Sequence, residues 1–409
     1  MGASPSGGPR GDLLRLLRAA LARVEGRSSV RDWLRQHPIA TAPALLAIGK
    51  AAESMTLGAL DALPEGVADG LVISKAGHLD PQRLARHGLI GLTAGHPLPD
   101  VHSLEAGERL LAFLARQPAG RELLCLISGG ASSLVEVLRP GLSLEQLQRT
   151  NAWLLASGLP IAAMNRVRRA LSRIKGGGLL GYLGPRRVTA LLISDVEGDD
   201  PAVIGSGLLF PSPATELSDL PLPPWLRPWV QAPEPPAAGP PVAAHIVARL
   251  ADAMEAAAAE GRRLGYPVRL RRAFQNGEAE TVGRRLAREI LEAPPGLLLW
   301  GGETRVRLPA EPGRGGRNQQ LALAAATVLQ GAAGVWLLAA GTDGSDGPGE
   351  DAGALVDGGT LARGQAEGLD AVESLRRADA GSFLAAAGDL LHTGPTGANV
   401  MDLLIGLRA

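Results

Sequence analysis

The sequence predicts an α/β protein with two domains, and three observations support this. The chain has 409 residues, which is more than one hydrophobic core ordinarily serves. Apolar runs of strand length alternate with segments whose apolar residues recur at helical spacing, a pattern typical of parallel strands joined by helices. A proline-rich stretch over residues 211–241 separates two such series. Because proline interrupts regular elements, we interpret this stretch as a linker or an extended wrap.

The first series forms a predicted larger domain over residues 1–235. It opens with a short leader and an amphipathic helix, and helical patterns follow at 104–117 and 144–157. Continuous apolar strands between helices predict a doubly wound, mostly parallel sheet with helices on both faces. The strands are expected at PALLAIG (43–49), GLVIS (70–74), LIGLT (89–93), ELLCLIS (122–128) and VTALLIS (188–194).

The second series forms a predicted smaller α/β domain over residues 242–409. It begins with a long helix predicted over 243–265, and helices are also expected at 277–292 and 317–330. Because ligands bind outside the carboxyl ends of parallel strands, we expect the functional site at those ends, in a cleft between the two domains. The strands of this domain are expected at 267–273, 296–302, 335–341 and 400–407.

Composition excludes several classes of protein. Lys+Arg and Asp+Glu both number 41, and aromatic residues make up 3%, which argues against binding to nucleic acid or to an acidic membrane. The single cysteine, Cys125, excludes a disulfide framework and a cysteine-rich zinc site, and its apolar neighbours predict a buried thiol. The sequence shows neither a signal-peptide core nor an apolar run of about 18 residues, so we expect a soluble, cytoplasmic protein.

Polar residues follow the strands of the first domain, where the sheet rule places a site. Lys50 stands between a strand end and a helix start, where an ammonium can reach an anion bound at the helix, and Lys75 ends the next strand. Gly129 and Gly130, followed by Ser132 and Ser133, offer N–H groups and hydroxyls that suit a phosphate or a carboxylate. A solvated lysine and a tight turn with a serine N-cap remain open as alternatives.

Two other segments of the first domain carry charge. Asp195 follows the strand at 188–194, where it suits a metal ligand or a general base. The segment 161–179 is predicted to be a basic helix that runs into three glycines, and it either binds an anion or presents a solvated face. Three arginines are expected to share one face of it, and a lysine precedes the glycines: Arg166, Arg169, Arg173 and Lys175.

In the second domain, Glu303 follows a strand and Arg317 stands at a helix start within GRGGRNQQ (313–320). The loop GTDGSDGPGEDAGA (341–354) has calcium-like composition, but its spacing fails for an EF-hand, because Pro348 would occupy the position that requires glycine. Its acids either hold Mg²⁺ or order neighbouring basic residues, and both alternatives stay open. The candidate acids are Asp343, Asp346 and Asp351.

Two motifs are missing, which narrows the chemistry. The sequence has neither the G-x-x-x-x-G-K-[ST] of a P-loop nor a G-x-G-x-x-G after a strand. Basic side chains, glycine amides, hydroxyls and carboxylates nevertheless suit phosphoryl transfer, in which positioning and charge stabilisation dominate.

These segments, in this order, resemble the glycerate 2-kinases of the D-glycerate kinase type, whose C-terminal part is called the MOFRL domain. Each motif alone is weak, but ten occur in register through about 350 residues. The matching segments are AIGKAA, GHPLPD, LISGGASSL, N-x-V-R-x-x-LSRIKGGGL, LISDVEGDDP, GGET, GRGGRNQQLAL, GTDGSDGP, DAGA and TGPTGANVMDL.

The resemblance implies phosphorylation of D-glycerate at its 2-hydroxyl, with ATP and Mg²⁺, to give 2-phosphoglycerate. It implies catalytic roles for Lys50, Asp195 and Arg317. We expect the substrate and its phosphate to be bound by Lys75, Gly129, Gly130, Ser132, Ser133, Arg168, Lys175, Glu303 and Asn318. The expected metal ligands are Asp195, Asp343, Asp346 and Asp351.

The chain departs from the family pattern near its end. Relatives often have T-N-V-N-D where this chain has Ala398-Asn399-Val400-Met401-Asp402. The competing function is an NAD(P)-dependent hydroxypyruvate reductase, against which the missing dinucleotide fingerprint argues, and a third is a sensor of small acids. The choice of the 2-hydroxyl rests on the resemblance alone, and a homodimer is one assembly that the sequence leaves open.

Overall fold

The computed structural model describes residues 8–159, 161–211, 217, 219–230 and 239–409, and it divides into two compact units. One is continuous, from Gly26 to Val247, and we call it the inserted unit. The other joins Met1–Glu25 to Ala248–Ala409, and we call it the split unit. This division differs from the predicted boundaries of 1–235 and 242–409, because residues 8–25 group with the C-terminal part of the chain and residues 242–247 with the inserted unit.

The inserted unit contains a six-stranded sheet in the order β3-β2-β1-β4-β5-β6. Strands β1 to β5 pair in parallel, as the apolar runs predict. Ile90 in β3 is 40% exposed, because β3 lies at the edge of the sheet. The strands are β1 (Ala44–Ile48), β2 (Asp69–Lys75), β3 (Ile90–Ala94), β4 (Leu123–Ile127), β5 (Val188–Ile193) and β6 (Val242–Ala248).

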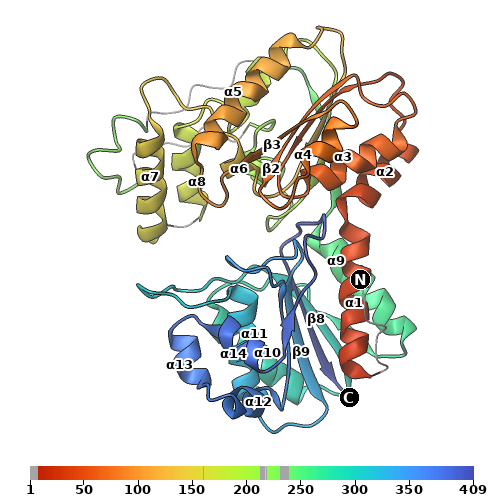
Figure 1. The fold of residues 1–409 in the computed structure, drawn as a ribbon, viewed down its shortest axis with the longest axis vertical. Helices are drawn as coiled ribbons and strands as arrows, with labels where there is room; N and C mark the ends of the chain where they lie inside the picture. The colour runs from red at the N-terminus through yellow and green to blue at the C-terminus, as the bar shows by residue number, and fades with distance from the viewer. Residues whose placement is uncertain (1–7, 160, 212–216, 218, 231–238) are drawn as a thin grey trace. The chain divides into compact units, whose positions relative to one another are not determined.

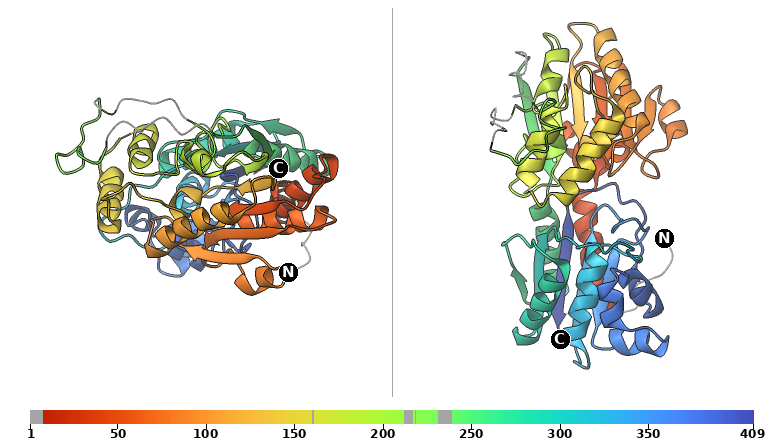
Figure 2. Two further views of the ribbon diagram at one scale, coloured as in Figure 1. Left: turned by 90° about the horizontal axis from the view of Figure 1, so that it is seen from above. Right: turned by 90° about the vertical axis from the view of Figure 1, so that its left-hand side faces the viewer.

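Helices cover both faces of this sheet (Figure 1 and Figure 2), with α3 packed against β1 and β2 and α5 against β2 and β3. The start of α5 is set by a capping box, in which the Asp100 carboxylate accepts a hydrogen bond from the backbone N–H of Ser103. The helices are α2 (Gly26–Gln36), α3 (Ala52–Ala62), α4 (Pro81–Ala85), α5 (Val101–Arg116), α6 (Ala131–Leu134), α7 (Leu144–Ala156) and α8 (Ile161–Ala170), with short 3₁₀ turns at Gly178–Tyr182 and Ile204–Ser206.

The split unit contains a mixed sheet in the order β11-β10-β9-β12-β8-β7. Strand β12 lies between β8 and β9 and runs antiparallel to both, so β8 and β9 point in the same direction. The strands are β7 (Val268–Leu270), β8 (Gly296–Gly302), β9 (Val335–Gly341), β10 (Gly353–Asp357), β11 (Leu390–Leu391) and β12 (Asp402–Arg408).

In the split unit, α1 and α9 lie on one face of the sheet and α10 and α11 on the other (Figure 1). Trp300, fully buried, belongs to the core on the α10 and α11 side. Among the described residues, none of the helices is both long and apolar enough to cross a bilayer. The helices are α1 (Pro9–Val24), α9 (Leu250–Arg263), α10 (Ala279–Glu292), α11 (Arg317–Leu329), α12 (Thr360–Ala366), α13 (Ala371–Arg376) and α14 (Ala380–Ala386).

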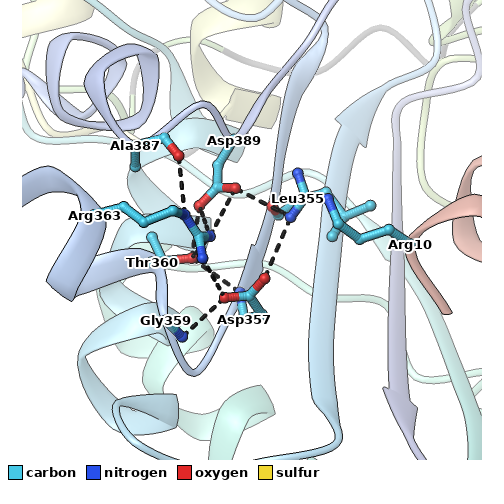
Figure 3. Close-up of polar contacts among 8 residues, drawn as sticks. All are labelled: Arg10, Leu355, Asp357, Gly359, Thr360, Arg363, Ala387 and Asp389. Carbon is cyan, nitrogen blue, oxygen red and sulfur yellow. Dashed lines mark hydrogen bonds and ion pairs between the residues drawn. The ribbon is translucent and has the colours of Figure 1, made fainter. Parts of the chain in front are cut away.

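A network of charges fixes the start of α1 to the split unit (Figure 3). Arg10 donates to the carbonyl of Leu355 at 3.0 Å, and its Nη1 lies 3.1 Å from the buried carboxylate of Asp389. Arg363 binds the same carboxylate at 2.6 Å and also contacts Asp357 at 3.0 Å. These polar contacts, together with the buried leucines of α1, explain why the first segment of the chain belongs with its C-terminal part.

Several predicted elements differ from the structure. Residues 242–248, predicted as the start of a long helix, form β6, and the helix starts only at Leu250. The β-branched residues of this segment favour a strand, and the Asp252 carboxylate accepts from the N–H of Arg249 at the true helix start. Helix α8 ends at Ala170, so Arg173 leaves the predicted basic face and lies over the ring of Tyr182.

Part of the strand structure was not predicted, and two predicted segments lie at least partly outside the described residues. Strand β10 was missed, because its sequence GALVD follows an acidic loop without a long apolar run. The predicted leader and parts of the proline-rich stretch lie at residues 1–7, 212–216, 218 and 231–238, outside the part that the structure describes.

Candidate active site

The carboxyl edge of the inserted unit's sheet has a topological switch point. The chain proceeds from β1 to β2 and β3 on one side and returns to β4 and β5 on the other side. Strands β1 and β4 are parallel neighbours, so Lys50 and Gly129 follow strands that end side by side. Open parallel sheets bind ligands at such a reversal, so we keep this edge as the candidate site of the inserted unit.

The loop after β1 is locked to the loop after β4. The Lys50 N–H donates to the carbonyl of Gly129 at 2.9 Å, and the Ala51 N–H donates to Oγ of Ser128 at 3.0 Å. Gly49 has φ +131°, and a Cβ there would lie 2.2 Å from Oγ of Ser128. Only glycine fits this close approach, which places Lys50 at the switch point.

Gly130 brings two side chains together. It has φ +87°, and a Cβ there would lie 3.1 Å from the His96 ring and 3.2 Å from Cγ of Lys50. The Nδ1 atom of His78 lies 3.2 Å from the carbonyl oxygen of Lys50. Two histidines to which the sequence assigned no role thus stand beside the candidate lysine.

The two serines that follow have different surroundings. Ser133 is buried, and both its N–H and its hydroxyl lie 3.2 Å from the carbonyl oxygen of Gly130, to which they donate. A tight turn is therefore present, as the alternative of the sequence analysis expects, but the N-cap of α6 is Gly130 and not a serine. Ser132 is half-buried, so it remains the better candidate of the two for a ligand contact.

Lys75 and Asp195 share the carboxyl edge with Lys50. Lys75 is the last residue of β2, and Asp195 stands two residues beyond the end of β5. Because β1, β2, β4 and β5 are parallel, their carboxyl ends lie on one side of the sheet. The sequence analysis placed both residues at this edge correctly.

Lys175 meets a carboxylate of the protein itself. Its ammonium forms a buried ion pair with Glu136, whose other oxygen accepts from the Ser172 hydroxyl at 2.6 Å. Lys175 therefore has a protein carboxylate as its partner in this structure, where the sequence analysis expects an anionic substrate. Glu136 follows α6 and its N–H donates to the carbonyl of Ser103, so the pair connects the serine loop with the glycine turn after Lys175.

Arg168 differs from Lys175, because it donates to neutral amides. Its Nε lies 3.1 Å from Oδ1 of Asn151, and its Nη1 lies 3.5 Å from Oδ1 of Asn165. Burial lowers the pKa of the Arg168 guanidinium. Because these amide partners are neutral, they do not offset the positive charge of the guanidinium, which can still attract an anionic ligand.

In the split unit, three chain segments meet at one edge of the sheet. Asp402, the first residue of β12, pairs with Gly302 at the end of β8 and with Gly341 at the end of β9. Arg317, the first residue of α11, donates from Nε and Nη2 to both oxygens of Asp402, at 2.6 and 2.9 Å. Its Nη1 lies 2.8 Å from Oε1 of Glu303.

Charges in this cluster act strongly on one another. Burial alone would lower the pKa of the Arg317 guanidinium, but the carboxylates of Asp402 and Glu303 outweigh it and the pKa is raised. Burial raises the pKa of Asp346 to about 6, although the N–H groups of Asn318 and Gln319 donate to its carboxylate. Asp346 therefore caps α11 from a distant loop.

The candidate metal ligands of the loop 341–354 contact groups of the protein itself. Asp351 contacts Arg314 and His392, each at 2.8 Å, and Asp343 accepts from the N–H of Ser345 at 2.9 Å. Asp351 thus contacts basic residues, as the second of the two alternatives expects, whereas Asp343 and Asp346 accept from backbone N–H groups. Across the described residues, no three His, Cys, Asp or Glu side chains gather as a metal site.

The chain has three lysines among its 41 basic residues, and all three were predicted site residues: Lys50, Lys75 and Lys175. All lie in the inserted unit. At all other basic positions of the sequence the residue is arginine, whose planar guanidinium differs in shape from the compact ammonium of lysine.

Comparison with known proteins establishes the family. Residues 12–220 match the family described as a domain of unknown function, DUF4147, and residues 296–402 match the MOFRL family. The D-glycerate 2-kinase of Thermotoga maritima is 36% identical over 384 residues, which cover 89% of this chain and 90% of that protein. The chain belongs to the glycerate kinase family.

A solved structure and a further relative complete the comparison. The crystal structure of a glycerate kinase from Thermotoga maritima superimposes with a TM-score of 0.82 at 33% identity, over 97% of this chain and 98% of that one. It confirms the two-part α/β fold, and membership in the glycerate kinase family makes the protein a kinase. A relative from Agrobacterium vitis, 38% identical over 96% of this chain and 92% of its own length, has a name that gives hydroxypyruvate reductase as a provisional activity.

Three residues were missed as candidates by sequence reasoning. Asp402 lies 85 residues from Arg317 in sequence, and only the sheet register brings them together. Glu136 and His96 follow apolar segments without a recognisable chemical pattern of their own. The sequence signal that could have identified Asp402 is its place in TGPTGANVMDL, one of the motifs shared with the family, to which no role was assigned.

Proposed function

We propose that this protein phosphorylates D-glycerate at the 2-hydroxyl, using ATP with Mg²⁺, and releases 2-phosphoglycerate and ADP. The observation that carries the proposal is the placement of Lys50 at the β1/β4 switch point, against Gly129 and Gly130. An ammonium beside glycine amides is suited to a phosphate. The names of the relatives, D-glycerate 2-kinase and glycerate kinase, support the choice of substrate.

The reaction forms one bond and breaks one. The 2-hydroxyl oxygen attacks the γ-phosphorus of ATP, the bond from that phosphorus to the bridging oxygen breaks, and ADP leaves. We assign the hydroxyl proton to the carboxylate of Asp195 and the neutralisation of the transferring group to Lys50. Ser132 and Arg168 are the proposed contacts for the carboxylate or the phosphates of the substrates.

In the split unit we assign Arg317 to a phosphate, because a guanidinium offers paired N–H groups to an oxyanion. Mg²⁺, when bound, offsets the negative charge of the phosphates. The residues Asp343, Asp346 and Asp351 do not fit a shared magnesium site, since their oxygens accept from or pair with protein groups. In the proposal the ion therefore arrives with the nucleotide, as Mg²⁺ commonly does.

The test is product analysis with a matched variant. Wild-type protein with D-glycerate and ATP·Mg²⁺ should yield phosphoglycerate, and NMR of the product identifies which hydroxyl carries the phosphate. Incubation with NAD(P)⁺ in place of ATP examines the reductase alternative. Oxidation of glycerate without phosphoglycerate would replace the kinase proposal by that alternative.

Lys50→Ala should lower kcat by about a hundredfold or more, because one electrostatic contact at a transferring group is worth several kcal/mol. Lys50→Arg should restore little of this loss, since the guanidinium has another shape. Circular dichroism and Tm should stay near the wild-type values for both variants. A folded Lys50→Ala with normal turnover would remove Lys50 from the mechanism.

A further inference from the structure

The two carboxylates on Arg317 differ in how firmly they are held. The side chain of Asp402 is 3% exposed, and its backbone is fixed between β8 and β9. It receives two hydrogen bonds from Nε and Nη2, the bidentate geometry that orients a guanidinium best. Arg317 cannot leave Asp402 without burying an unpaired charge.

Glu303 contacts the other edge of the guanidinium and is far more exposed than Asp402. Its side chain is 46% exposed, and the ion pair joins one carboxylate oxygen to Nη1 at 2.8 Å. Its backbone N–H donates to the carbonyl of Gln275 at 2.9 Å, so only the side chain has to move. Half-exposed ion pairs of this kind contribute little free energy.

The number of donors permits an exchange. A guanidinium carries five N–H groups, and Asp402 accepts from two of them, one on Nε and one on Nη2. The edge formed by Nη1 and the remaining Nη2 hydrogen can receive two oxygens of a phosphate, whereas Glu303 contacts it through one. A phosphate can therefore replace Glu303 and gain a contact, while Asp402 keeps the guanidinium in place.

We propose that Asp402 is the fixed positioning residue of Arg317 and that Glu303 is its exchangeable ligand, a carboxylate that a substrate phosphate displaces from Nη1. This inference rests on the proposed function, because it takes the anion at Arg317 to be a phosphate. It gives Glu303 a role opposite to the one that sequence reasoning assigned: Glu303 competes with the substrate at Arg317.

The test measures ATP binding by calorimetry at constant ionic strength for two variants that each remove one negative charge beside Arg317. Glu303→Gln should bind ATP about two- to fivefold more tightly, the change expected for one half-exposed ion pair. Asp402→Asn should bind ATP about tenfold or more weakly, because the guanidinium loses its buried bidentate partner. Glu278→Gln is the control and should bind as wild type does, since the Glu278–Arg305 pair has a similarly exposed carboxylate.

Tighter ATP binding by Glu303→Gln together with weaker ATP binding by Asp402→Asn supports the inference. Tighter binding by both would mean that only net charge matters, and unchanged binding by Glu303→Gln would mean that Glu303 does not compete; each result overturns the inference. Asp402 is buried, so ATP-dependent shifts of Tm show whether its variant is folded, and Glu303→Gln alone remains decisive if it is not. A wild-type protein that makes phosphoglycerate separates these failures from a failure of the proposed function.

Discussion

At the scale of single residues, the inserted unit separates its three lysines by environment. Lys50 and Lys75 stand at the ends of parallel strands, whereas Lys175 is buried against Glu136. A buried ion pair stabilises weakly as a pair, but either charge alone in a dry site costs a great deal. The same residue type thus carries a proposed chemical role at Lys50 and a structural one at Lys175.

The pair Lys175–Glu136 is open to a double-mutant test. Lys175→Met should lower the free energy of unfolding of the inserted unit by about 3–5 kcal/mol, because it leaves Glu136 buried without a cation. Adding Glu136→Gln removes the orphaned charge and should recover most of this loss. Denaturant unfolding of the two single variants and the double variant measures the coupling, and additive costs would show that the pair is not a unit.

Asp346 should make stability depend on pH. Its pKa is raised from 3.8 to about 6, so the folded chain keeps a proton that the unfolded chain releases between these values. The stabilisation is complete below the unfolded pKa and is lost as pH rises through the folded pKa. The loss approaches about 3 kcal/mol for a shift of this size.

Asp346→Asn should therefore flatten the plot of unfolding free energy against pH between about 4 and 6. Urea unfolding at several pH values measures this slope. Asp370→Asn is the matched control, because Asp370 also caps a helix, α13, but is exposed. An equal slope in Asp346→Asn and the wild type would contradict the raised pKa.

At the scale of elements, polar contacts of Arg10 help to fix α1 to the split unit. Arg10→Ala removes the contacts to Leu355 and Asp389 and should destabilise the split unit by about 1 kcal/mol, the usual contribution of one half-exposed charged hydrogen-bonding group. Amide hydrogen exchange in α1 should accelerate while exchange in the inserted unit stays unchanged.

Arg18→Ala provides the control for this experiment. Arg18 lies on the exposed side of the same helix, so its removal tests helix propensity without the network. Equal exchange in both variants would show that the apolar face of α1 holds the helix without help from Arg10.

Strands and helices with long apolar runs or clear spacing were predictable. β4, β5, β8 and β9 fall on continuous apolar runs, and their positions at the sheet centre explain why. Short segments, and segments that mix helix-favouring with strand-favouring residues, were not predictable, because pairing with neighbouring strands overrides local propensity. The sequence of β6, VAAHIVA, has as many alanines as β-branched residues and therefore suits a helix as well as a strand, and β10 owes its strand conformation to pairing with β9.

The candidate site was predictable where it follows strands and not where it depends on register. Lys50, Asp195 and Glu303 could be placed because the end of an apolar run marks the edge of a sheet. The partner of Arg317 could not, since β12 brings Asp402 from a distant part of the chain. Likewise, no local pattern shows that Lys175 is neutralised inside the protein.

At the scale of the whole molecule, the sequence indicates two α/β domains and predicts the first helix in the first of them, whereas the structure groups α1 with the C-terminal part of the chain. Local patterns mark α1 as amphipathic without showing which sheet its apolar face covers. That information lies in α9, β9 and β12, which α1 contacts and which come more than two hundred residues later. Local sequence patterns therefore do not show that one continuous unit is inserted into another, divided unit.

The division of the split unit has a consequence for biosynthesis. The ribosome makes α1 before the inserted unit and makes α9 and β12 after it. The apolar face of α1 therefore lacks these contacts until the whole inserted unit has been translated. The inserted unit is continuous and can fold during that interval. β12 follows every other described strand and enters between β8 and β9, so the nascent sheet stays open at its centre until β12 exists. Because Asp402 is the first residue of β12, Arg317 acquires this carboxylate partner only in this late step.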